Sequence, residues 1–192
     1  MKVKIEIPQD YSAITVEQFQ QLNAVWEKGK EPHWRAVQGV VILCGVQSDV
    51  AQRLTIGTLN TVYEKLQWLM DSKDKPFPLQ PIMELNGKRY GMIPDFTRLS
   101  LGEFVDLEAH AKSGFFESLH KVMAVLFRPI TDSMKDHYEI QAYNPSPIKD
   151  KAMLQAPMSV ALGAMVFFLN IGQRLAVDSH SYLTAQDQEN RP

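Results

Sequence analysis

The chain has 192 residues, 21.8 kDa and 45% hydrophobic residues, enough for one proper core, and we expect a single domain over residues 1–192. Its formal net charge of −2 gives no overall basic signal for nucleic acid. One cysteine, Cys44, excludes an internal disulfide. The longest apolar run, 158–171, has about 14 residues, short of the roughly 20 that cross a bilayer, so no membrane segment is expected.

The N-terminal part is predicted to be mostly helical. Residues 2–7 alternate charged and apolar side chains, which predicts a half-buried strand. Thr15 and Gln18 then have the spacing of a capping box, in which each side chain bonds the other residue's backbone N–H, so a helix is expected to begin there. Apolar residues recur at helical spacing through 33–44 and 49–70.

Residues 71–81 contain three prolines and several charges, which predicts a surface linker or a binding loop. Phe77 and Pro78 are its exposed candidates for protein contact, because aromatic anchors in polar surroundings favour interfaces. At the other end of the chain, residues 185–192 are polar and are expected to form a flexible tail.

Residues 82–93 predict a β-hairpin, because two short β-like runs flank the turn dipeptide Asn86-Gly87. A lone hairpin is marginal in water, so it needs a third strand or a partner, and the segment 2–7 is the obvious third strand. Lys88 and Arg89 beside the turn are candidate interface residues, and the hairpin edge could accept a strand from a partner. Gly91 indicates a bulge or a close approach of another backbone segment.

The stretch 97–129 is expected to form the centre of the core. Ser100 and Glu103 have capping-box spacing and predict a helix over 101–112. Glu103 and the other acids are expected to lie elsewhere on the surface of this helix. The stripe that faces the core is expected to consist of four apolar residues: Leu101, Phe104, Val105 and Leu107. Gly114 is expected to end this helix in a left-handed conformation.

A second helix of this stretch is expected to run from about 115 to 128. It should stop there because a proline, Pro129, disfavours the α conformation of the residue before it, and Arg128 would then lie at the negative end of the helix dipole. The remainder predicts a loop at 131–137, an extended segment at 138–143, and a buried helix from 158 to the low 180s. The fold class is therefore mainly α with a small antiparallel β-sheet (α+β).

Few residues in this chain point to catalysis, and no catalytic residue, metal or cofactor is assigned. Glu103, Asp106 and His110 could bring three ligand types near one helix face, which leaves a metal-dependent enzyme as an alternative, but a solvated acidic face explains the same spacing. Small basic clusters, such as Lys88 with Arg89, leave a nucleic-acid-associated factor as a further alternative. The chain has more large apolar side chains than catalysis would need, and this excess favours a role in protein–protein interaction.

The order of segments over 82–170 resembles a group of small tailed-bacteriophage morphogenesis proteins. The segments are a hairpin ending in IPDF, then TRLSLGEFVDLE, a helix ending in MAVLFRPI, the segment YEIQAY and a final helix with SVALGAMVFFLN. The resemblance implies a non-enzymatic tail-assembly chaperone or a neck or tail structural protein. It also implies other phage structural proteins as partners, with a homo-oligomer left open, and a place in the host cytoplasm during assembly or in the virion.

Overall fold

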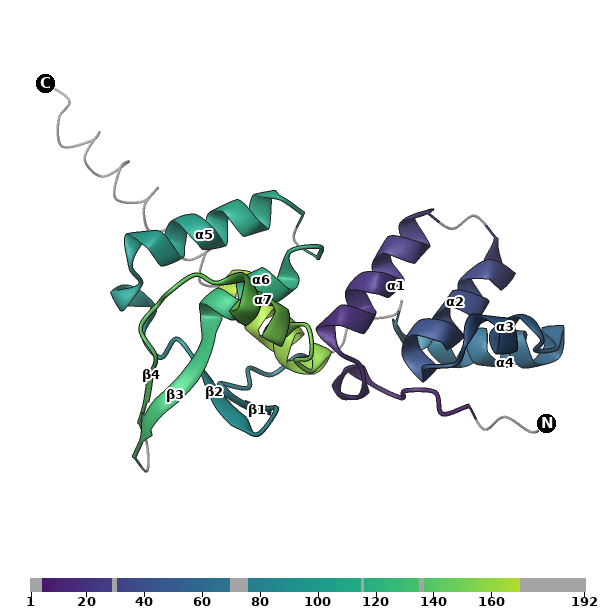
Figure 1. Cartoon of the computed structure of the whole chain (residues 1–192), viewed down its shortest axis with the longest axis horizontal. Coiled ribbons are helices and arrows are strands. Elements are labelled where there is room, and N and C mark those ends of the chain that lie inside the picture. Colours follow the sequence, from purple (N-terminus) through teal and green to yellow (C-terminus); the bar gives the residue numbers. More distant parts are fainter. Residues whose placement is uncertain (1–4, 29–30, 70–75, 115, 135–136, 170–192) are drawn as a thin grey trace, which may run out of the picture.

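The computed structural model describes residues 5–28, 31–69, 76–114, 116–134 and 137–169. It confirms a mainly helical chain with a small antiparallel sheet (Figure 1). The helices are α1 (Val16–Lys28), α2 (Pro32–Cys44), α3 (Ser48–Gln52), α4 (Ile56–Leu66), α5 (Leu101–Lys112), α6 (Leu119–Leu126) and α7 (Pro147–Met153), with 3₁₀ turns η1 (Tyr11–Ala13), η2 (Gln67–Leu69) and η3 (Phe96–Arg98). Residues 158–169 are also helical.

Helices α1 to α4 form one group, beside a second group built from the sheet, α5, α6 and α7 (Figure 1). The predicted capping box at the start of α1 is confirmed: Thr15 N donates to Gln18 Oε1 at 2.9 Å, and Gln18 N donates to Thr15 Oγ1 at 3.2 Å. Helix α2 starts with Pro32 in its first turn and ends at Gly45, whose φ of 63° is left-handed. Local sequence signals therefore define where these helices begin and end.

The sheet has the strand order β1 (Ile82–Leu85), β2 (Lys88–Met92), β3 (Phe127–Ser133) and β4 (Tyr138–Ile140), with every neighbouring pair antiparallel. The predicted hairpin is confirmed, with positive φ at both Asn86 (52°) and Gly87 (71°). The segment that comes close to Gly91 is a side chain and not the predicted backbone, because the ring of Tyr138 lies where a side chain at position 91 would be. The ring of Tyr138 on β4 therefore reaches across β3 to β2.

The predicted third strand is wrong. Residues 5–7 are in no strand, the rest of the segment 2–7 lies outside the described residues, and β3 pairs with β2 instead, in the register Met92↔Phe127. Ile5 and Ile7 pack against the core without strand pairing. Strand β3 follows α6 without a loop, and Ile93 N bonds Leu126 O at 2.9 Å. The end of α6 therefore places β3 beside β2, at the edge of the hairpin.

The predicted helix 115–128 is too long at both ends. Helix α6 covers Leu119–Leu126, and at Phe127 the backbone turns extended, with φ −111° and ψ 125°. Pro129 does act on the preceding residue as expected, but by placing Arg128 in β3 rather than at a helix end. The predicted loop 131–137 is partly strand, since β3 continues to Ser133. Of the predicted last helix, residues beyond 169 lie outside the described part.

One core cluster joins the two groups of elements. Its largest fully buried side chains include Phe127, Leu126 and Met123 from the α6–β3 junction. The segment before α1 pairs with the segment before the helix 158–169: Val16 N bonds Ala156 O at 2.9 Å, and Met158 N bonds Ile14 O at 2.9 Å. Segments distant in the sequence therefore close the core.

Candidate functional site

Helix α5 begins with two successive caps. Asp95 accepts from Thr97 N at 2.9 Å and so starts η3, and Ser100 Oγ accepts from Glu103 N at 3.3 Å to start α5. Glu103 Oε2 in return accepts from Ser100 N at 2.7 Å, which completes the predicted capping box. These bonds fix the position of the first turn of α5.

The carboxylate of Glu103 does more than cap the helix. It is only 4% exposed, and its Oε1 lies 2.7 Å from Nη2 of Arg128, which is 9% exposed. The Arg128 guanidinium also lies 5.9 Å from the ring centre of Tyr143. Within the described residues, Arg128 Nε has no hydrogen-bond acceptor although it is buried. A buried ion pair therefore joins α5 to β3, and one of its donors is unsatisfied.

The polar side of α5 faces inward, which corrects the predicted orientation. Glu103 and Leu107 are buried, and Asp106 and His110 are half-buried. These positions follow the i, i+3, i+4, i+7 spacing of one helix face. Tyr143 reaches this face and donates its hydroxyl hydrogen to Asp106. Burial, and secondly this hydrogen bond, raise the pKa of Tyr143.

The outer side of α5 is apolar. Leu101 is 78% exposed, Phe104 is 53% exposed and Val105 is 50% exposed. Three of the four residues predicted to face the core therefore face solvent, and only Leu107 is buried. Apolar side chains that gather on one exposed face are typical of interaction surfaces. We call Leu101, Phe104 and Val105 the outer face of α5.

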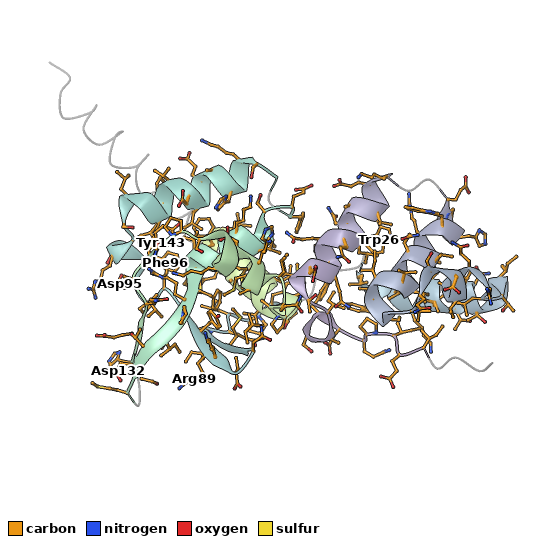
Figure 2. The ribbon with its side chains drawn as sticks, in the orientation of Figure 1. Trp26, Arg89, Asp95, Phe96, Asp132 and Tyr143 are labelled. Carbon is orange, nitrogen blue, oxygen red and sulfur yellow. The ribbon has the colours of Figure 1, made fainter. Side chains whose placement is uncertain are left out.

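A cleft of about 550 Å³ opens beside the first turn of α5. Its walls come from η3, α5, β3 and β4, and Asp95 and Tyr143, which both line it, are labelled in Figure 2. Its charged lining residues are Asp95, Arg98, Glu103, Arg128 and Glu139. A smaller hollow of about 240 Å³ also touches Tyr143 and is lined by Asp106, His110 and Lys149.

The residues proposed as metal ligands do not come together as a site. Glu103 is engaged by Arg128, Asp106 is engaged by Tyr143, and His110 lines the smaller hollow. Across the described residues, no group of three or more His, Cys, Asp or Glu side chains is arranged to hold a metal ion. The i, i+3, i+7 spacing therefore places Glu103, Asp106 and His110 on the side of α5 that packs against the rest of the chain.

The predicted interface residues of the proline-rich loop are partly occupied by contacts within the chain. Phe77 is half-buried and packs edge-on against Tyr11, with ring centres 5.4 Å apart. Pro78 is exposed, but its carbonyl oxygen lies 2.5 Å from where a Cβ at Gly163 would be, so this segment crosses the helix 158–169 at a glycine. Residues 71–75 lie outside the described part. Phe77 is thus not the free anchor that its sequence context predicted.

Lys88 and Arg89 are exposed on β2, and Arg89 lies away from α5 (Figure 2). They remain candidate contacts. The outer face of α5 and the role of Arg128 were not predicted from the sequence. A signal for Arg128 was present, since a cation inside the apolar segment MAVLFRPI needs a buried acid as partner.

Comparisons of the chain with models of protein families, with curated proteins and with solved structures give no match. Among the helices in the described ranges, none is long and apolar enough to cross a membrane.

Proposed function

We propose that this chain is a non-enzymatic protein-interaction protein of bacteriophage virion morphogenesis, acting as a tail-assembly chaperone or as a neck or tail structural protein. The observation that carries the interaction role is the outer face of α5. The phage context rests on the resemblance of segments 82–170 to morphogenesis proteins. The partners in this proposal are other phage structural proteins, met in the host cytoplasm during assembly.

The outer face of α5 exposes apolar side chains that a partner could bury. Complete burial of a leucine, phenylalanine or valine side chain contributes about 1.5–3 kcal/mol. Leu101 keeps most of its surface in water and Phe104 keeps about half, so a partner that covered them could still gain much of this energy. Because the capping box and the ion pair hold the helix, these side chains are presented on a rigid element, which limits the entropy lost on binding.

Substitutions on the outer face test the proposal. We expect Leu101→Ser with Phe104→Ser to abolish co-purification of the chain with the co-expressed structural proteins of its particle, while leaving its thermal unfolding nearly unchanged. Ile56→Ser is the matched control, because Ile56 is 67% exposed on α4, outside the proposed surface. Partner recovery that is equal for both variants would remove α5 from the proposal.

Mass spectrometry of purified particles separates the two roles. Many copies of the chain per particle are expected for a structural protein. Absence from particles, with expression during assembly, is expected of a chaperone.

A further inference from the structure

Strand β1 lies at one edge of the sheet, and part of its backbone points away from β2 (Figure 1). Met92 N donates to Pro81 O at 2.8 Å, so the residue directly before β1 forms a hydrogen-bonded pair of the antiparallel ladder. Hydrogen-bonded and non-hydrogen-bonded pairs alternate along such a ladder. Given the regular register of β1 with β2, the N–H and C=O groups of Ile82 and Glu84 therefore point toward the open edge.

These edge groups are available for pairing. Within the described residues, the backbone of Ile82 and of Glu84 has no hydrogen-bond partner. Both side chains are exposed, and Ile82 is 37% exposed. Unpaired backbone at a sheet edge is a template for strand addition, and proteins often block it with a bulge or a lysine. Strand β1 has a regular register and contains no lysine, so neither device protects it.

We propose that β1 pairs antiparallel with β1 of a second copy of this chain, about a two-fold axis at Met83. In this register Ile82 lies opposite Glu84 of the second copy, and the two residues exchange both of their N–H···O bonds. The two-fold axis repeats this pair, so the edge groups of both copies are satisfied and the two sheets become one. The pairing goes beyond the proposed function and does not depend on it.

A second copy fits this edge because the strand is self-complementary in that register. An axis at Glu84 would set two acids directly opposite each other, which is destabilising. An axis at Ile82 would require pairing by Gln80, which precedes the strand. With the axis at Met83, each Glu84 lies opposite an isoleucine and has Arg89 of its own chain across from it on β2. The charges therefore do not oppose the pairing.

The mass of the full chain in solution measures the pairing. Because the paired edge is short, we expect a weak dimer with a Kd on the order of 0.1–1 mM. Sedimentation equilibrium at chain concentrations from about 0.02 to 1 mM, which span this Kd, should show the mean mass rising toward that of a dimer. Over the same range, hydrogen exchange followed by NMR should show increasing protection of the Ile82 and Glu84 amides. The Met83 amide, which faces β2, should not change.

Charge substitutions at Ile82 report the register. Ile82→Lys places a cation opposite Glu84 of the second copy, whereas Ile82→Glu places an acid there. Because the axis repeats this pair, the Kd of Ile82→Lys should be lower than that of Ile82→Glu by at least about fourfold at low ionic strength. Ile56→Lys and Ile56→Glu are the matched controls. They make the same changes of net charge at a residue that is 67% exposed on α4, so their Kd values should be equal.

Four results would overturn the pairing. They are a mass that stays monomeric at about 1 mM, amide protection that does not include the edge of β1, equal Kd values for the two Ile82 variants, and loss of the dimer in Leu101→Ser with Phe104→Ser. The last result would place the contact on the outer face of α5. A monomeric chain whose outer-face variant still loses its partners would reject the pairing and keep the proposed function. A β1 dimer whose outer-face variant keeps its partners would do the reverse.

Discussion

Replacing Glu103 with alanine tests whether the buried ion pair holds α5 against the sheet. The substitution removes the 2.7 Å contact with Arg128 Nη2 and the bonds from Ser100 N and Oγ at 2.7 and 2.6 Å. It leaves Arg128 as a cation that is 9% exposed and has lost its acid. Removing one partner of a buried pair typically costs about 3–5 kcal/mol, so we expect the free energy of unfolding to fall by that amount.

Glu108 provides a matched control on the same helix. It pairs with Lys112 at the same 2.7 Å, but the two side chains are 51% and 74% exposed. Exposed pairs contribute about 0–1 kcal/mol, so Glu108→Ala should be nearly neutral. Urea denaturation followed by far-UV circular dichroism measures both variants. Equal losses would refute the reasoning that burial, rather than the N–O distance, sets the cost.

Further predictions concern packing and protonation. Gly163→Ala should lower the free energy of unfolding by about 1–3 kcal/mol, because its methyl group would lie 2.5 Å from a backbone carbonyl oxygen, whereas Gly102→Ala, with nothing within 4 Å, should be neutral or stabilising; thermal unfolding compares them. The pKa of His120 is lowered, chiefly by burial. The contribution of His120 to stability is therefore present above pH 6.5 and is lost as the pH falls below that value. We expect His120→Gln to make the urea midpoint of unfolding depend less on pH in that acidic range. The pKa of Tyr143 is raised, so its contribution is present below pH 10.0 and is lost as the pH rises above it; Tyr143→Phe should remove that alkaline loss in the same assay.

Local chemistry made the ends of several elements predictable. The two capping boxes and the hairpin turn at Asn86-Gly87 depend on residues within four positions of each other, and the structure contains all three. The positive φ of Gly114, 103°, also follows from a local rule, the left-handed end of a helix. Such features need no knowledge of the tertiary fold.

The orientation of α5 was not predictable in the same way. Periodicity predicts that the apolar face of a helix meets the core, but it does not register a partner elsewhere in the chain that can bury an acid on the opposite face. Glu103 faces inward because Arg128 reaches it from β3, 25 positions later in the chain. The prediction of the third strand failed for a related reason. Residues 2–7 have the right alternation, but β3 follows α6 directly and so lies beside the hairpin, where it pairs with β2.

The pairing of residues 14–17 with residues 154–158 has a consequence for synthesis of the chain. Glu17 and Gln155, which bond across this junction, are 138 positions apart. At about 5–20 residues per second, a ribosome needs about 7–28 s to make the intervening polypeptide. During this interval Ile14 and Val16, which are finally 1% and 0% exposed, lack the segment with which their backbones pair. We expect elongation, rather than chain diffusion, to determine when the nascent protein can complete its interior.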